Sequence, residues 1–173
     1  MNPSYSDEYS NYKVITVTPT IVPGSPTAFA AADVFFAPTE IPNAVAYDGG
    51  CSKLIGIGII DQADQSLDLT FIFMQVSTAL GTVNAVVDIT DSNLEAAKIQ
   101  GIVTVDFSTV DVDLVLSKVA YFAGGSDTAG VNQLPMLLQA ASGTTSLYVS
   151  AIINGSATMA AADDLDLLFH IQR

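Results

Sequence analysis

The sequence has few of the residues on which enzymes and metal proteins most often rely. Its 173 residues include one cysteine, Cys51, one histidine, His170, and no tryptophan. A single cysteine excludes a disulfide within the chain and a zinc site built from several thiolates. The histidine stands in no recognisable motif with a serine or cysteine, so a hydrolase triad is not predicted. We therefore expect no catalytic residues, no cofactor and no enzymatic activity.

Positive charge is also scarce. Five basic residues stand against eighteen acidic ones, which gives a formal net charge of −13. Such a chain should be repelled by nucleic acid and by anionic membrane surfaces, so neither is expected as a partner. Charged residues make up only 13% of the chain and apolar residues 50%, whereas soluble domains contain roughly 25% charged residues. This composition favours an oligomer or a docked subunit, because contacts with other subunits cover apolar surface.

The chain contains no long apolar run. The uncharged stretches 69–87 and 128–162 are interrupted by polar and turn residues, and a membrane-spanning helix needs about 20 consecutive apolar residues. We therefore expect no transmembrane helix. The opening residues, MNPSYSDEYSNYK, contain no basic region followed by an apolar one, so they do not predict a secretory signal.

The acidic residues form clusters, which are the strongest candidates for a ligand site. These clusters are Asp61, Asp64 and Asp68; Asp88 and Asp91; Asp111 and Asp113; and Asp163, Asp164 and Asp166. Calcium binds carboxylates in such loops, but no segment matches an EF-hand, and acid-rich turns are ordinary on so acidic a chain. We therefore expect no metal site. Paired carboxylates also serve glycoside hydrolysis, but no tryptophan is present to stack on a sugar.

From Asp33 onward, short apolar runs alternate with clusters of Gly, Asn, Asp and Ser, a pattern typical of strands and turns. Ser92 and Glu95 form a capping-box pattern, which predicts one short helix. Asn154 and Gly155 predict a two-residue hairpin turn. The predicted strands are 33–36, 53–60, 67–76, 84–89, 100–107, 111–122, 134–139, 145–153 and 164–172. The fold class that fits is all-β: an antiparallel two-sheet sandwich, jelly-roll-like, with one short connecting helix and an extended N-terminal arm.

The expected arm comprises residues 1–32 and precedes the β-sandwich domain, residues 33–173. Three prolines fall within eight positions of it, and proline is excluded from helix interiors and central strands. Tyr5, Tyr9 and Tyr12 lie on the arm. Aromatic rings provide a large contact area at a low entropy cost, so these tyrosines are expected to anchor the arm on a neighbouring protein. A disordered tail is the alternative.

The stretch SLDLTFIFMQV, residues 66–76, has one apolar side and one mixed side. On the mixed side, two polar residues are followed by Ile72 and Met74, although a solvated sheet face should stay polar along the whole strand. Ile72 and Met74 are therefore expected to contact another protein. The alternative is that a loop of the same chain covers them. The last strand, DLDLLFHIQ, repeats the pattern and places Leu168 on its mixed side.

The strand signatures from Asp33 to Arg173 resemble a known family. The segments that carry the resemblance are DVFFAP, KLIGIGIIDQADQSLDLTFIFMQV, VVDITDSNLEAAKIQGIVTV and LYVSAIINGSATMAAADDLDLLFHIQR, in this order. Together they are similar to the capsid decoration, or cement, proteins of tailed bacteriophages. The resemblance covers about four fifths of the chain and involves no catalytic motif.

The resemblance implies a jelly-roll subunit, often trimeric, that is fixed to the outside of an icosahedral head. The expected partners are the protein itself, as a homotrimer, and the major capsid protein, and the expected location is the outer surface of the virion capsid. The alternative function is an acidic β-sandwich binding module of a phage tail or bacterial surface, which recognises a glycan or host surface with possible help from calcium. The candidate interface residues are Tyr5, Tyr9, Tyr12, Ile72, Met74 and Leu168.

Overall fold

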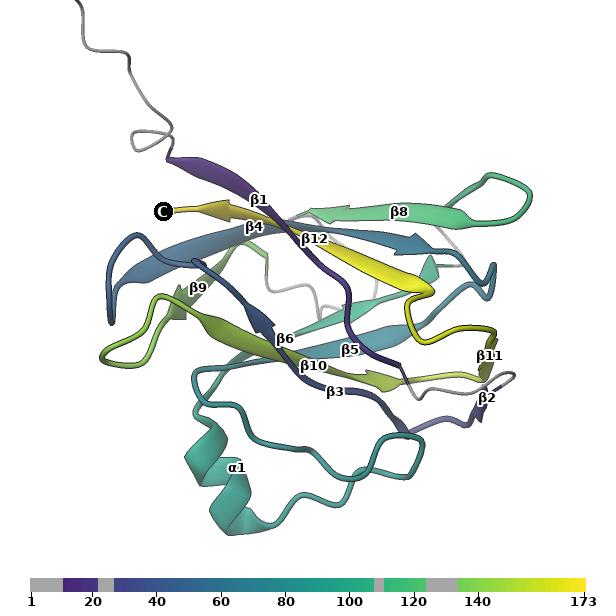
Figure 1. The fold of residues 1–173 in the computed structure, drawn as a ribbon, viewed down its shortest axis with the longest axis horizontal. Coiled ribbons are helices and arrows are strands. Elements are labelled where there is room, and N and C mark those ends of the chain that lie inside the picture. The colour runs from purple at the N-terminus through teal and green to yellow at the C-terminus, as the bar shows by residue number, and fades with distance from the viewer. Residues whose placement is uncertain (1–10, 22–26, 108–110, 124–133) are drawn as a thin grey trace, which may run out of the picture.

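The protein is a sandwich of antiparallel sheets. The computed structural model describes residues 11–21, 27–107, 111–123 and 134–173. These residues contain twelve strands and one helix, and the strands form two large sheets that pack face to face and one small sheet (Figure 1). This arrangement confirms the expected all-β sandwich with one short helix.

The larger sheet contains six strands, with β1 at one edge and β7 at the other. The strand order is β1-β12-β4-β8-β7, and β9 also pairs with β4. The strands are β1 (Tyr12–Val17), β4 (Cys51–Asp61), β7 (Asp111–Asp113), β8 (Lys118–Ala123), β9 (Met136–Gln139) and β12 (Leu165–Gln172). The single strand expected over 111–122 is in fact the β7–β8 hairpin. Its turn begins where the Asp113 carboxylate accepts a hydrogen bond from the backbone N–H of Val115.

The smaller sheet has the order β3-β10-β5-β6. Its strands are β3 (Val34–Ile41), β5 (Leu69–Met74), β6 (Ile99–Val105) and β10 (Leu147–Ile153), while β2 (Thr27–Phe29) and β11 (Ala157–Met159) form a separate two-stranded sheet. The early strands β4 and β5 lie in different sheets, and the late strands β12 and β10 return beside them. This pairing of early with late strands is the jelly-roll-like feature of the fold.

Two local predictions were wrong. Asn154 and Gly155 join β10 to β11, but these strands do not pair with each other. Instead, the Asn154 amide donates a hydrogen bond to the Thr70 hydroxyl at 3.0 Å, which ties the end of β10 to β5. The strand expected over 84–89 is also absent: two isolated bridges join Val83 and Val86 to residues at the start of β3.

The expected arm contributes to the sandwich. β1 pairs with β12 along its whole length, from Tyr12 opposite Gln172 to Val17 opposite Leu167. Four apolar side chains of segment 1–32 are buried in the main core: Ile15, Val17, Ile21 and Phe29. The edge position of β1 agrees with the prolines that follow it, because an edge strand tolerates a missing N–H donor. Residues on both sides of the expected arm–domain boundary at residue 32 therefore belong to the same hydrophobic core.

The main core fills the space between the two large sheets. Alternate residues of β5 and β12 point into it, as their sequences predict. Phe73 of β5 and Phe169 of β12 meet across the core edge to face, with ring centroids 5.8 Å apart and an interplanar angle of 82°. This geometry is favourable for aromatic rings, and it holds the two sheets together.

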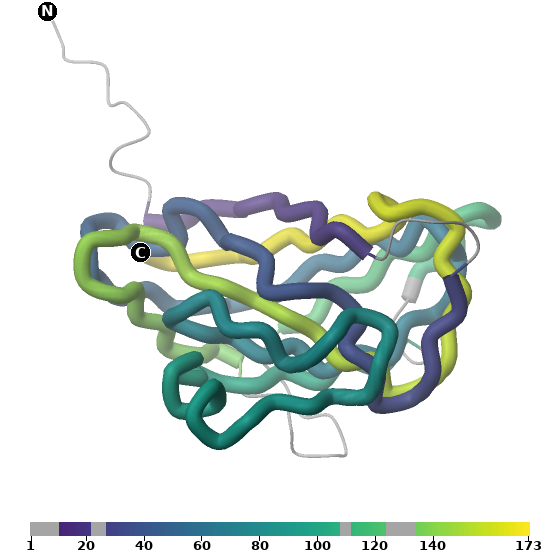
Figure 2. Tube along the Cα trace, turned by 60° about the horizontal axis from the view of Figure 1, so that its bottom comes forward, coloured from purple at the N-terminus to yellow at the C-terminus, as the bar shows by residue number. Residues whose placement is uncertain are grey.

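A second apolar cluster lies on the opposite side of the smaller sheet. The connection from β5 to β6, residues 75–98, covers this side, and it comes forward in teal in Figure 2. It includes helix α1 (Asp91–Ala97), whose N-cap is Thr90 rather than the expected Ser92: the Thr90 hydroxyl accepts a hydrogen bond from the backbone N–H of Asn93. The helix therefore starts two residues earlier than its capping-box pattern indicates.

This cluster answers the question raised by Ile72 and Met74. Met74 is fully buried and Ile72 is 7% exposed, and both pack in the cluster with Val34, Leu80 and Ala97. Their expected contact with another protein is therefore corrected: a segment of the same chain covers them, as the alternative interpretation held.

Candidate functional site

The outer side of the six-stranded sheet carries a group of apolar side chains from four strands. Leu168 of β12 lies opposite Gly58 of β4, which lies opposite Tyr121 of β8. In the next row, Ile60, Val119 and Val112 follow one another across β4, β8 and β7. Because directly opposed residues point to the same side of an antiparallel sheet, these side chains share one surface. We call it the apolar face, defined by Ile60, Val112, Val119, Tyr121 and Leu168.

The described chain leaves the apolar face open. Helix α1 and the rest of the 75–98 connection lie beyond the smaller sheet, on the side of the sandwich away from the larger sheet (Figure 1). Val112 and Tyr121 are at least half exposed, and Ile60, Val119 and Leu168 are partly exposed. The described residues thus cover the outer side of the smaller sheet and leave the outer side of the larger sheet accessible.

Two glycines of β4 flatten this surface. A Cβ added to Gly56 would lie 2.6 Å from Cζ of Tyr121, so only glycine leaves room for the tyrosine ring to lie across the strand. A Cβ added to Gly58 would lie 3.2 Å from the Cβ of Leu168. Tyr121 also meets His170 edge to face, with ring centroids 4.9 Å apart. The result is a flat surface whose aromatic group is held in place by its neighbours.

Charge is confined to the ends of the apolar face. Among the described residues that point outward from β4 and β12, the charged ones are Lys53 at one end and Asp166 at the other. Asp166 accepts hydrogen bonds from the hydroxyl of Thr18 and from the Gln62 amide, the latter at 3.2 Å. The centre of the face is uncharged although the molecule carries a net charge of −13. An uncharged apolar centre with a polar margin is typical of a protein interface.

The structure separates the sequence-predicted interface residues. Leu168 lies within the apolar face, and Tyr12 lies on the edge strand β1, where its hydroxyl accepts a hydrogen bond from the Gln172 amide at 3.4 Å. Ile72 is on the other side of the molecule with Met74, inside the second cluster. Tyr5 and Tyr9 lie outside the described residues.

Sequence reasoning missed Tyr121 and its neighbours. The stretch KVAYFA, residues 118–123, does alternate, but both of its sides contain apolar residues. Alternation predicts which residues share a side of a strand, but it does not predict which side faces the core when both sides are apolar. The choice depends on the partner strands, because Ala120 and Phe122 face the core in the register that β8 makes with β4.

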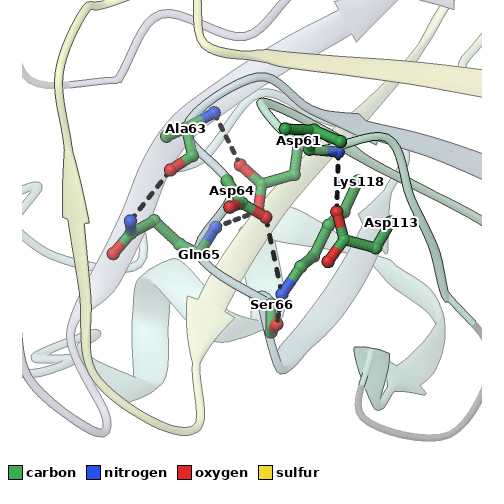
Figure 3. Close-up of polar contacts among 8 residues, drawn as sticks. Asp61, Ala63, Asp64, Gln65, Ser66, Asp113 and Lys118 are labelled. Carbon is green, nitrogen blue, oxygen red and sulfur yellow. Dashed lines mark hydrogen bonds and ion pairs between the residues drawn. The ribbon is translucent and has the colours of Figure 1, made fainter.

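The best-ordered acidic cluster lies in the loop that follows β4. The buried Asp61 carboxylate accepts hydrogen bonds from the backbone N–H groups of Ala63 and Gln65, at 3.0 and 2.7 Å (Figure 3). Asp64 forms an ion pair with the Lys118 ammonium group at 3.5 Å, and Lys118 also donates a hydrogen bond to the Ser66 hydroxyl. Groups of the chain itself therefore neutralise and bind these carboxylates. In the described ranges, no three or more His, Cys, Asp or Glu side chains are grouped so as to hold a metal ion.

The buried Asp61 and the partly buried Asp68 have altered pKa values. Burial raises the pKa of Asp61 above its usual value, and the nearby Asp64 charge adds to this, while the backbone hydrogen bonds oppose it. Burial also raises the pKa of Asp68, although its carboxylate accepts a hydrogen bond from the Phe107 backbone N–H. Asp61 is the last residue of β4 and Asp68 precedes β5, and their hydrogen bonds to backbone N–H groups order the adjoining connections.

Comparisons with known proteins add no relative. No protein-family model matches the chain, and no curated protein matches it. In the part of the chain that the structure describes, no helix has the length and apolar character of a membrane span.

Proposed function

We propose that this protein is a non-enzymatic virion structural protein, which decorates the outer surface of an icosahedral phage head and cements neighbouring capsid subunits. The observation that carries the proposal is the open apolar face on a molecule of net charge −13. The partner, the major capsid protein, is inferred from the resemblance of the strand signatures to those of decoration proteins. The acidic character suits an outer surface, because packaged DNA repels a negatively charged subunit.

The size of the apolar face favours attachment through several copies. Fully burying one large apolar side chain contributes about 1.5–3 kcal/mol, and the five side chains of the face are already partly covered. Association costs about 4–15 kcal/mol in lost freedom of motion. One face alone therefore binds weakly, whereas linked faces bind at a high effective concentration. A homotrimer that presents three faces to the capsid meets this requirement.

A charge placed on the apolar face tests the proposal. Leu168→Asp adds a carboxylate to the β12 side of the face. Val86→Asp is a matched control, because Val86 is exposed on the loop that covers the other sheet. Phage heads depleted of the protein are incubated with each variant, and the bound protein is measured after sedimentation. We expect Leu168→Asp to lose binding and Val86→Asp to bind as the wild type does. Equal binding of both variants would exclude the apolar face as the attachment surface.

A binding module for a host glycan remains the alternative function, and the Tyr121 ring favours it. This ring lies flat and half exposed beside His170, an arrangement suited to stacking on a sugar. The number of copies per particle distinguishes the two functions. A copy number proportional to that of the capsid protein indicates cement, and a few copies at the tail indicate receptor recognition.

A further inference from the structure

The turn between β7 and β8 is an exposed apolar protrusion. Its side chains Leu114, Val115 and Leu116 are 55%, 82% and 80% exposed. We call these three residues the apolar tip. Exposed apolar side chains scattered singly are normal on protein surfaces, but three in succession at the end of a hairpin form a contiguous patch.

The apolar tip is held in a defined shape. The backbone N–H of Leu114 donates to the Ser117 carbonyl at 2.9 Å, and that of Val115 donates to the Asp113 carboxylate at 2.7 Å. Val115 has φ of +80°, which is unusual for a β-branched residue and costs conformational energy. The two hydrogen bonds hold this conformation while the three apolar side chains stay mostly exposed, so the tip is already in a shape that a partner could bury.

The opposite end of the same sheet contains a matching hollow. It has a volume of about 170 Å³ and is lined by Tyr12, Lys13, Val14, Ile55, His170 and Ile171. A β-bulge creates it: His170 pairs with Gly56 and Ile171 pairs with Leu54, so Ile55 is left without a partner on β12. The extra residue bends the strand locally, and the resulting hollow is mainly apolar and large enough for aliphatic side chains.

The tip and the hollow of one molecule cannot meet. Lys118, at the base of the tip, pairs with Asp61, the last residue of β4. Tyr12, at the hollow, pairs with Gln172, and Gln172 lies opposite Lys53 near the start of β4. The turn before β8 and the first residues of β1 accordingly lie at opposite sides of Figure 1. Any contact between tip and hollow must therefore join two molecules.

We propose that the apolar tip of one copy inserts into the hollow of the next copy, in a head-to-tail contact that closes into a ring. This inference rests on the proposed homo-oligomer and defines its contact surfaces. A contact between unlike surfaces generates a ring when its rotation closes. Each copy carries a net charge of −13, so identical acidic surfaces would repel each other. A contact between unlike surfaces avoids this repulsion.

The distribution of charge supports this contact. Three of the five basic residues lie at the end of the sheet that bears the hollow: Lys13, Lys53 and Arg173. Within the described residues, Lys13 and Lys53 take part in no ion pair. The base of the tip carries the exposed Asp113 and, opposite it, Lys118, whose charge is paired with Asp64. Head-to-tail association brings the Asp113 carboxylate toward the lysines of the next copy, whereas contact between two identical surfaces would oppose like charges.

Variants of each surface test the contact. Leu116→Gln alters the tip, and Val14→Lys places a charge in the hollow. Val86→Gln is the control, because Val86 is also exposed but lies outside both surfaces. Mass is measured by analytical ultracentrifugation, with circular dichroism to verify folding. We expect the wild type and Val86→Gln to exceed the monomer mass of 18.0 kDa, and the other two variants to sediment as monomers.

Mixing the two monomeric variants provides the decisive result. The tip variant keeps its hollow and the hollow variant keeps its tip, so an equimolar mixture should form a heterodimer that grows no further. Absence of the heterodimer, a monomeric wild type or an oligomeric Leu116→Gln protein would each overturn the head-to-tail contact. Attachment to phage heads through Leu168 is measured separately, so these outcomes leave the proposed cement function open to its own test.

Discussion

Ile72 and Leu168 both point outward from a sheet, but only Leu168 is accessible to a partner. The 75–98 connection covers Ile72, and the cluster that contains it excludes water. No described segment covers Leu168, which lies over Gly58 between β1 and β4. The same type of side chain therefore contributes to folding stability in one sheet and is available for binding in the other.

Substitutions to aspartate should separate these roles. Ile72→Asp buries an unpaired carboxylate, so we expect a loss of about 3–5 kcal/mol in the free energy of unfolding. Phe71→Asp places the charge in the main core and should be at least as damaging. Leu168→Asp should cost about 1 kcal/mol or less, because its charge remains in contact with water. Urea denaturation measures all three, and a stable Ile72→Asp protein would contradict the burial of this side.

Asp61 should make stability depend on pH. Because burial raises its pKa in the folded protein above the ordinary value of 3.8, the folded form retains this proton to a higher pH than the unfolded form. The stabilising contribution of the protonated carboxyl is therefore fully present below pH 3.8 and is lost as the pH rises through the raised pKa.

The Asp61→Asn variant isolates this effect, since its amide does not titrate. We expect the free energy of unfolding of the wild type, relative to Asp61→Asn, to decrease as the pH rises and then to become constant. Denaturation midpoints at constant ionic strength measure the difference, in which the contributions of the other carboxylates cancel. A difference that increases with pH would show that the hydrogen bonds from Ala63 and Gln65 outweigh burial.

At the scale of elements, two segments without a strong strand pattern complete the molecule. β1 adds an edge to the larger sheet, and the 75–98 connection covers the smaller one. Each provides what its sheet lacks: β1 pairs with the exposed edge of β12, and the connection with α1 buries the apolar outer side of β5. Both segments are therefore structural parts of the sandwich.

Deletion of residues 1–32 should abolish the fold. It removes four buried side chains, Ile15, Val17, Ile21 and Phe29, which at about 1.5–3 kcal/mol each contribute roughly 6–12 kcal/mol. The total stability of a domain is about 5–15 kcal/mol. We expect circular dichroism to show loss of the β signal. A folded truncated protein would mean that the remaining strands suffice.

Deletion of residues 1–10 is the matched comparison. It retains β1 and removes Tyr5 and Tyr9. We expect the β signal and the denaturation midpoint to be unchanged, and binding to phage heads to decrease if these tyrosines anchor the protein there. Unchanged binding would exclude them from the interface.

For the whole molecule, the choice of partners depends on how charge is distributed over the surface as well as on the net charge. The net charge of −13 should repel partners such as DNA, whereas the uncharged apolar face and the basic end near the hollow lack this dense negative charge. We expect the protein to cause no shift of duplex DNA in gel electrophoresis, even at low salt. Electrostatic binding of proteins to DNA is strongest under these conditions. A retarded complex would contradict the assignment to the outer surface.

Local sequence patterns were sufficient to predict the class of the fold and most of its strands. Alternation in β5 and β12 identified the side chains that form the main core, because the two sides of a strand follow directly from backbone geometry. Composition predicted the acidic surface and the absence of disulfides, since these depend only on residue counts. The short helix was also predicted, although its N-cap was misplaced from Thr90 to Ser92.

Which outer side of a sheet is covered depends on long-range packing. The 75–98 connection buries Ile72 and Met74 through contacts with residues distant in sequence, such as Val34, and no local pattern specifies where a loop will pack. The apolar face likewise requires the register of β12, β4 and β8, which brings Leu168 and Tyr121 to the same surface. Long-range pairing places these residues together, so the candidate site exists only in the folded protein.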